Sequence, residues 1–184
     1  MQVKKLEEIA EIFSGVQISR FKDKFSKKYP VIKNKFLKDE ILEYDLVNIS
    51  NGINQKYFSK KGDIIISLSQ PNKVSILHEE GHIIPMYFAI IRLKESYNPS
   101  FIYHLLNSVE FHKKIHSSLE GGSLKIIKVS DLKRIQIRIP DYEKQVEYAK
   151  FFNLVDRKNQ LLTDKKRCNE KLKEYVIKTE LKGE

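Results

Sequence analysis

The spacing of apolar positions predicts a sheet in the first half of the chain. Residues 64–68 form a run of isoleucines followed by Ser67 and Leu68, which is typical of a buried strand, and the turn signal Lys61-Gly62-Asp63 precedes them. Three more segments have strand character, namely 45–49, 74–77 and 86–93. The pattern predicts a meander or barrel-like sheet and leaves its parallel or antiparallel order open.

Two shorter segments flank this region. Residues 6–13 fit either a short helix or a strand and end at the turn signal Ser14-Gly15. Near residue 140, apolar and polar positions alternate as in a strand that Pro140 closes. The apolar positions of this strand are Ile135, Ile137 and Ile139.

Helical spacing starts after residue 97. Asn98 is a suitable N-cap, Pro99 suits the first turn, and Gly121-Gly122 is a stop signal. We expect one helix between these signals, with a single apolar face made of Phe101, Ile102, Leu105, Leu106, Val109 and Ile115.

A much longer helix is predicted for residues 142–181, where neither Pro nor Gly interrupts the chain. About 40 residues at 1.5 Å per residue would span roughly 60 Å. Its early apolar positions should pack on the domain, and they are Val146, Tyr148, Ala149, Phe151, Phe152, Leu154 and Val155. The later positions thin to a narrow seam that should pair with another helix, and they are Leu161, Cys168, Leu172 and Tyr175.

Together these elements predict an α+β protein with one domain over residues 1–140, which has a mostly β core and peripheral helices. Residues 141–184 form the long C-terminal helix. With 41% hydrophobic and 32% charged residues, the composition suits a folded domain. Because Cys168 is the only cysteine, an internal disulfide is excluded and a reducing, cytoplasmic setting is expected, and neither a signal peptide nor a membrane-spanning run is visible.

The net charge of +10 is concentrated in the domain, where 23 Lys/Arg stand against 15 Asp/Glu in residues 1–140. Such an excess attracts polyanions. The densest cluster is the aromatic-rich segment 20–38, which we expect to be a loop with short strands that contacts phosphates; a solvated surface loop is the alternative. The cluster's predicted DNA-contacting residues are Arg20, Lys22, Lys24, Lys27 and Lys28.

Two further segments offer polar groups for DNA. The turn after the buried strand carries donors and acceptors suited to base edges, and its predicted contacts are Gln70, Asn72 and Lys73. Gly121-Gly122-Ser123, with Lys125, could bring backbone amides close to phosphate, although a helix C-cap accounts equally well for the glycines. Ser123 and Lys125 are included among the predicted contacts.

Three enzyme-like patterns lack the context that catalysis needs. The 98–101 segment is similar to the N-P-P-Y/F loop of amino-methyltransferases, but Ser100 replaces a proline and no glycine-rich cofactor loop accompanies it. Asp141 and Asp164 would lie about 35 Å apart on one helix, too far for one nuclease centre. His112 and His116 have ligand-compatible spacing without a carboxylate, which favours a surface pair over a metal site. We therefore expect no catalytic centre, metal or cofactor in this chain.

The order of segments resembles half of a DNA-specificity (S) subunit of type I restriction-modification systems. The similar segments are 5–12 before Ser14-Gly15, 61–67, and 98–103 at the start of a helix. More specific is the later series, in which Gly121-Gly122-Ser123 is followed by 128–132 and then by 137–145 at the entrance to the long helix.

The resemblance implies one target-recognition domain followed by a spacer helix. It implies that the chain recognises double-stranded DNA, while a DNA adenine methyltransferase subunit, and in some complexes a restriction subunit, carries cofactor and catalysis. A full subunit has two such domains and two such helices, so the chain is expected to be a half-subunit that forms a homodimer through its helix, or a fragment. A dimer would read inverted half-sites.

Another class of function stays open at this point. The chain could be a coiled-coil adaptor whose basic domain binds protein or RNA, with the long helix as its main functional surface. Competition between duplex and single-stranded nucleic acid separates this class from a DNA-specificity module.

Overall fold

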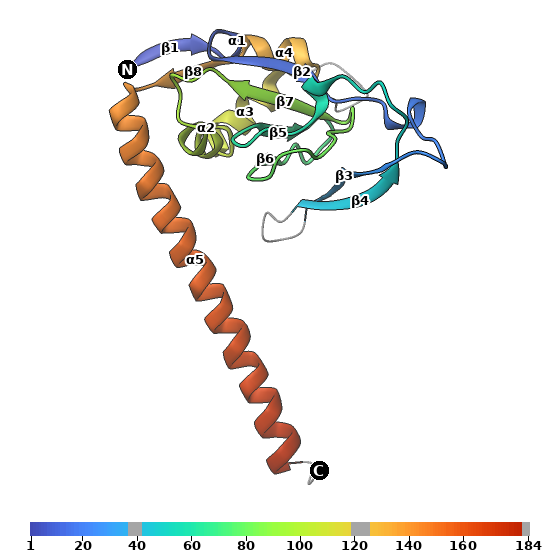
Figure 1. The fold of residues 1–184 in the computed structure, drawn as a ribbon. Coiled ribbons are helices and arrows are strands. Elements are labelled where there is room, and N and C mark those ends of the chain that lie inside the picture. Colours follow the sequence, from blue (N-terminus) through green and yellow to red (C-terminus); the bar gives the residue numbers. More distant parts are fainter. Residues whose placement is uncertain (37–41, 119–125, 182–184) are drawn as a thin grey trace.

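The computed structural model describes residues 1–36, 42–118 and 126–181, and Figure 1 shows a mixed domain from which one long helix projects. The central sheet has four strands in the order β2-β7-β5-β6, and each neighbouring pair is antiparallel. The strands are β2 (Ala10–Ser14), β5 (Ile64–Ser67), β6 (Val74–Ile76) and β7 (Phe88–Leu93). The strands predicted at 64–68, 74–77 and 86–93 are confirmed, and neighbouring strands of the sheet run antiparallel.

The N-terminal segment combines both structures expected for it. Strand β1 (Gln2–Lys5) leads into a single helical turn, α1 (Leu6–Ile9), and β2 follows directly. β1 pairs antiparallel with β8 (Gln136–Ile139), the predicted isoleucine strand. The two ends of the domain therefore lie side by side where the long helix begins (Figure 1).

Strands β3 (Lys28–Phe36) and β4 (Leu42–Asn48) form a separate antiparallel hairpin. β3 is longer than the short strands expected in the basic segment. Its length follows from burial, because Val31 and Ile32 both lie in apolar clusters between the hairpin and the rest of the domain. Two 3-10 turns flank the hairpin, η1 (Ile18–Arg20) and η2 (Gln55–Tyr57).

Both faces of β5 are buried, which explains its run of isoleucines. Ile64 and Ile66 lie in the main core with residues of α2 (Pro99–Leu106), α3 (Val109–Ser118) and α4 (Val129–Arg134). Ile65 lies in a second cluster that includes Ile32 of the hairpin. Helices therefore cover one face of the central sheet and the hairpin covers part of the other, in an α+β architecture.

The single helix predicted from residue 98 is two helices, α2 and α3. Asn98 caps α2 as expected, since its Oδ1 accepts from Phe101 N at 3.0 Å. The break follows from Ser108, whose hydroxyl donates to Leu105 O (2.7 Å) and accepts from Phe111 N (3.3 Å), so it ends one helix and starts the next. Val109 consequently leaves the apolar face and is 73% exposed. The Gly121-Gly122 stop signal lies outside the described residues, and α4 was not predicted because only Leu132 of its six residues is buried.

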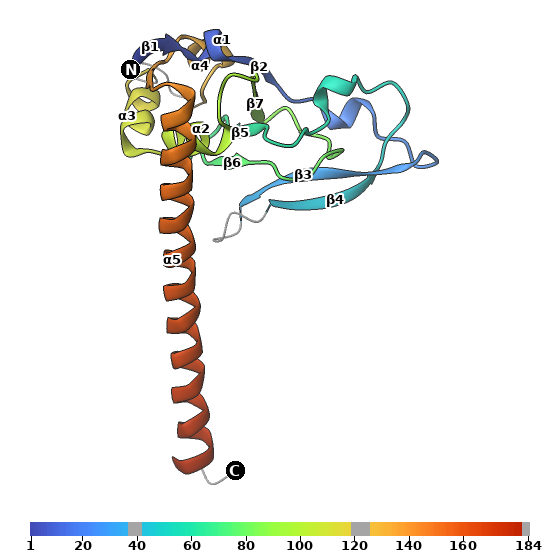
Figure 2. The same ribbon diagram turned by 60° about the vertical axis from the view of Figure 1, so that its left-hand side comes forward.

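The long helix α5 (Tyr142–Val176) continues into a π-helical turn, η3 (Ile177–Leu181). Asp141 caps it by accepting from Lys144 N at 3.0 Å, and this hydrogen bond lowers the pKa of the Asp141 carboxyl. Figure 2 shows that the start of α5 lies against the domain and that the rest extends away from it. Among the residues described, no helix is long and apolar enough to cross a membrane.

Fewer of the early apolar side chains of α5 pack against the domain than expected. Ala149 is buried and Phe152 is partly buried against the main core. Phe151, Leu154 and Val155, however, are 59%, 70% and 40% exposed. A straight helix with 3.6 residues per turn can turn only one stripe toward the domain, so the remaining apolar positions face away from it.

Candidate nucleic-acid interface

The basic loop, residues 20–28, connects η1 to β3 and holds five cations and one carboxylate. In both views it projects at the end of the domain farthest from α5 (Figures 1 and 2). All five cations are exposed, and none makes an ion pair within the described residues. They are the predicted contacts Arg20, Lys22, Lys24, Lys27 and Lys28. The loop is therefore a concentrated positive surface, and of its cations Lys27 also lies over the Tyr29 ring, with Nζ 5.6 Å from the ring centre.

Hydrogen bonds hold this loop in one shape. The Asp23 carboxylate accepts from the Ser26 hydroxyl and from Phe25 N (3.2 Å), and these two bonds lower the pKa of Asp23. Asn48 Nδ2 donates to Lys24 O at 2.8 Å, and Ile49 N donates to Lys27 O at 3.0 Å. Asp23 is thus occupied in ordering the turn, and the loop is tied to the end of β4.

The hairpin that carries the loop has a different charge balance. Lys33 on β3 pairs with Asp45 at 2.9 Å and with Glu43 at 3.7 Å on β4. The hydrogen bond to Asp45 is the main reason that the pKa of Lys33 is raised. Lys33 is therefore neutralised by its neighbours, whereas the cations of the basic loop make no ion pair within the described residues.

The turn between β5 and β6 forms a second polar surface, with Gln70 and Lys73 exposed. Asn72 is different, because it is fully buried at a positive φ of 49° and its Nδ2 donates to Ser67 O at 3.0 Å. Its side chain holds the turn from inside, which corrects its expected place among the DNA-contacting residues.

His116, which sequence analysis did not place at this surface, lies beside the same turn. Gln70 Nε2 is 3.4 Å from His116 Nδ1 at the end of α3. The chain before α4 also contacts this turn, because Ile127 N donates to Leu68 O, just after β5, at 2.8 Å. The i, i+4 spacing of the histidines located His116 on a helix, but no local signal indicated a contact with a residue 46 positions away. The predicted contacts Ser123 and Lys125 lie outside the described residues.

His112, one turn earlier on α3, should make stability depend on pH. Burial, followed by the nearby His116, lowers the pKa of His112. The unfolded chain then binds more protons than the folded chain near pH 6.5, so the free energy of unfolding should fall as pH drops through about 6.5. We expect His112→Gln to lose less stability than wild type in chemical denaturation between about pH 7.5 and 5. Replacement of the exposed His78 with Gln is the control. Equal losses of unfolding free energy in wild type and H112Q would contradict this expectation.

The enzyme-like patterns have structural roles where the structure describes them. Asn98 and Asp141 are helix caps, and Asp164 pairs with Arg167 at 2.9 Å on the projecting part of α5. In residues 1–36, 42–118 and 126–181 there is no group of three or more His, Cys, Asp or Glu placed to hold a metal ion.

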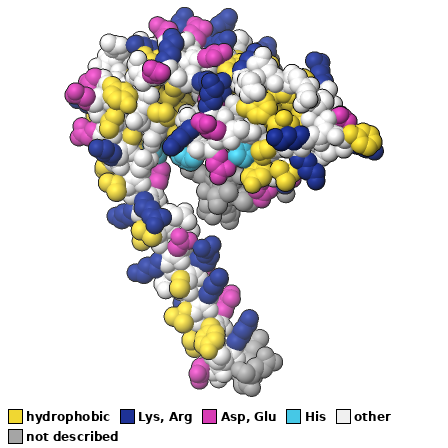
Figure 3. All heavy atoms as spheres, in the orientation of Figure 1, with side chains coloured by type: hydrophobic (Ala, Val, Ile, Leu, Met, Phe, Trp, Pro, Cys, Tyr) yellow, Lys and Arg dark blue, Asp and Glu magenta, His cyan; other side chains and the backbone are white. Residues whose placement is uncertain are grey.

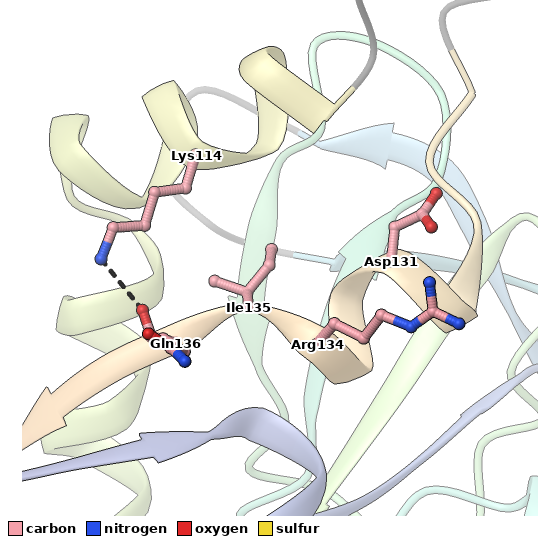
Figure 4. A pocket seen from close by; sticks show the side chains of 5 residues that line it. All are labelled: Lys114, Asp131, Arg134, Ile135 and Gln136. Atoms are coloured by element: carbon pink, nitrogen blue, oxygen red, sulfur yellow. Dashed lines mark hydrogen bonds between the residues drawn. The ribbon is translucent and has the colours of Figure 1, made fainter.

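An open pocket of about 410 Å³ lies between α3, α4 and the start of β8 (Figure 4). Lys114 Nζ donates to Gln136 O across it at 2.9 Å. Asp131 and Arg134 bring opposite charges to one wall, and Lys114 lines the pocket as a second cation.

The first part of α5 is fixed to α2 by polar contacts. The buried Gln145 accepts from Asn98 N (3.0 Å) and donates to Pro140 O (3.0 Å). Asn153 Oδ1 accepts from Ser100 Oγ at 2.9 Å, and His104 lies 3.6 Å from Asp156. Among the described residues, no hydrogen bond or ion pair joins α5 to the domain beyond Asp156.

An apolar stripe, the α5 seam, runs along the face that points away from the domain. Leu154, the first member, lies nine residues after Gln145, or about 180° around the helix. The other three members follow at intervals of seven residues. All four side chains of the seam are exposed, namely Leu154, Leu161, Cys168 and Tyr175. The predicted seam residue Leu172, 60% exposed, lies beside this stripe. Figure 3 shows hydrophobic side chains along the projecting helix.

Comparison with solved structures shows the same fold. The HsdS subunit from Thermoanaerobacter tengcongensis has a TM-score of 0.73 at 15% identity, covering 97% of this chain and 47% of that one. The S subunit of a type I restriction-modification system from M. genitalium has a TM-score of 0.62 at 16% identity, covering 96% and 45%. A chain from a structure of type I R-M complex assembly has a TM-score of 0.71 at 16% identity, covering 95% and 43%. The present chain thus spans less than half the length of each.

Sequence comparison gives a family-level result. Among curated protein sequences, none matches the chain. The family model of the type I restriction modification DNA specificity domain matches residues 1–171, which include the basic loop, the central sheet and most of α5. The chain therefore belongs to the type I restriction modification DNA specificity domain family.

Proposed function

We propose that this chain recognises a specific sequence in double-stranded DNA as the specificity subunit of a cytoplasmic type I restriction-modification complex. The observation that carries the proposal is the basic loop, whose five exposed cations make no ion pair within the described residues. Phosphate contacts give affinity and base contacts give specificity. We assign phosphate binding to the basic loop, and base reading to the surface around Gln70, Lys73 and His116.

In this proposal the chain carries no catalytic centre and no cofactor. A DNA methyltransferase subunit, with a restriction subunit in some complexes, supplies the chemistry. The chain itself determines where the partner acts, because it holds the partner at one DNA sequence.

We further propose that two copies form a homodimer through the α5 seam. The chain holds one domain and one long helix and spans less than half of the S subunits it resembles. The seam lies opposite the face that contacts α2, so a second helix can lie along it without displacing the domain. An exposed apolar stripe on a helix that extends from its domain gains stability chiefly by pairing.

An antiparallel pair fits the side chains of this seam best. It places Leu161 of one copy opposite Cys168 of the other, and Tyr175 opposite Leu154, so each larger side chain meets a smaller one. A parallel pair in register would instead place each seam residue, and the flanking Lys158 and Lys165, beside its own copy. The DNA half-sites of a two-fold dimer would be inverted repeats.

Light scattering and cysteine cross-linking should show this dimer. We expect twice the mass of the 21.7 kDa chain for wild type and the monomer mass for Leu161→Asp, which would bury a charge in the pair. Under mild oxidation, Leu161→Cys should form a disulfide with Cys168 of the other copy, whereas wild type should not. A monomer at every concentration would contradict the dimer, and ready cross-linking of wild type would show parallel helices.

Selection from a random duplex library tests DNA recognition. The purified chain, alone and with the methyltransferase subunit of the same system, should enrich two inverted half-sites at a fixed spacing. Single-stranded DNA or RNA should compete poorly. Failure to enrich any duplex under both conditions would contradict the proposal, and preference for single strands would favour an RNA-binding adaptor.

A further inference from the structure

Phe25 lies in the basic loop with 98% of its surface exposed. Other phenylalanines of the domain are buried in its cores, as Phe88, Phe101 and Phe111 are at 0%, 6% and 2% exposure. Figure 3 shows hydrophobic side chains beside Lys and Arg side chains at this end of the molecule. A phenyl ring held in water brings the folded chain no apolar burial, so a role outside the isolated chain has to account for it.

The backbone presents this ring in a defined position. Phe25 N donates to Asp23 Oδ1, and the carbonyl of the preceding Lys24 accepts from Asn48 Nδ2 on β4. Ser26 N donates to Asp23 O at 3.3 Å. The backbone of the turn is therefore ordered on both sides of Phe25, so little backbone entropy is lost when the ring meets a ligand.

The charges around Phe25 select the class of ligand. Lys24 precedes it, Lys22 and Lys27 lie two or three positions away, and none makes an ion pair within the described residues. Cations around an exposed aromatic ring suit a ligand that offers phosphates and stackable bases. The exposed Leu46 on β4 lacks such a cluster of cations, because its strand neighbours Asp45 and Glu43 are acidic and pair with Lys33.

We propose that Phe25 inserts between neighbouring base pairs of the bound duplex, while the lysines of the basic loop hold the flanking phosphates. Partial insertion of an apolar side chain unstacks one base step and bends the duplex there. The inference rests on the proposed DNA binding and deepens it, because it names the residue that deforms the DNA. Steps that unstack easily would then be favoured at this position, which adds specificity without a base-edge hydrogen bond.

Equilibrium binding measures the contribution of the ring. We expect Phe25→Ala to bind a fluorescent duplex of about 30 base pairs roughly 5- to 100-fold more weakly than wild type, as for the loss of one aromatic–base stack. The dependence of log K on log salt should keep its slope, because no charge is removed. Leu46→Ala, which removes an exposed apolar side chain from the same hairpin, should bind like wild type. Equal affinities for F25A and wild type would overturn the proposal.

Fluorescence separates insertion from a contact with a protein partner. The chain has no tryptophan, so Phe25→Trp introduces a single reporter. Duplex DNA should quench its emission and shield it from acrylamide, whereas the Leu46→Trp reporter should stay accessible. A fully accessible F25W reporter in a saturated complex would overturn insertion while leaving DNA binding intact. Absence of any duplex binding by wild type would overturn the proposed function, and this inference with it.

Discussion

Replacing Lys22, Lys24 and Lys27 together with alanine should weaken duplex binding by two to three orders of magnitude at about 0.1 M salt. Each phosphate contact contributes a slope of about −0.9 to the dependence of log K on log salt, so three lost contacts should flatten the slope by about 2.7. The three side chains are exposed and make no ion pair within the described residues, so folding should be nearly unaffected. Fluorescence anisotropy at several salt concentrations measures both affinity and slope.

A matched variant separates a local contact from a general effect of charge. Lys144, Lys150 and Lys166 are exposed on α5, and their replacement with alanine lowers the net charge by the same amount. We expect this variant to keep nearly the wild-type slope. If both triple variants lose equal affinity and slope, the basic loop is not the phosphate-binding surface, and the positive charge acts only over long range.

Features of the site that depend on neighbouring residues in the sequence could be predicted, and features that depend on distant residues could not. The basic loop could be found from sequence because dense lysines favour exposure and the carboxylate partners are few. The strand at residues 64–68 could be found because apolar β-branched side chains favour burial. Sequence could not supply the order of the central sheet, since β5 lies between β6 and the distant β7.

Three features of the domain depend on side-chain hydrogen bonds that the pattern of apolar positions does not reveal. Asn72 is a polar turn residue, yet its backbone geometry and its bond to Ser67 O turn the side chain inward. His116, at the end of α3, lies beside Gln70, which is 46 positions earlier in the chain. The helix predicted from residue 98 is divided because the hydroxyl of Ser108 competes for backbone hydrogen bonds, which the apolar period does not reveal.

One ion pair, in which Asp63 is buried and Arg92 is partly buried, connects the central sheet to the region of the hairpin that carries the basic loop. Arg92 on β7 donates to Asp63 through Nε (2.9 Å) and Nη2 (2.7 Å), and Nη2 also donates to Phe58 O at 3.1 Å. Phe58 packs against the apolar cluster under the hairpin, which contains Val31. The hydrogen bond to Asp63 is the main reason that the pKa of Arg92 is raised, so its guanidinium stays charged inside the domain.

Asp63→Ala should lower the free energy of unfolding by about 3–5 kcal/mol, because it leaves the Arg92 guanidinium without its anion. Only 2% of the Asp63 side chain and 16% of the Arg92 side chain are exposed, so water cannot replace the lost partner well. Asp63 Oδ2 also accepts from Lys60 N at 2.9 Å, and this turn would lose its bond too. Urea denaturation monitored by circular dichroism measures the change.

The double variant Asp63→Ala with Arg92→Met tests whether the unpaired charge is the cause. Removing both charges together should recover much of the lost stability, since a buried pair replaced by apolar side chains is often close to neutral. The exposed pair of Lys114 and Glu110 provides the control, because Glu110→Ala should cost less than about 1 kcal/mol. If D63A costs no more than this control, the Arg92 guanidinium finds water when Asp63 is absent, and the joint between sheet and hairpin depends on apolar packing alone.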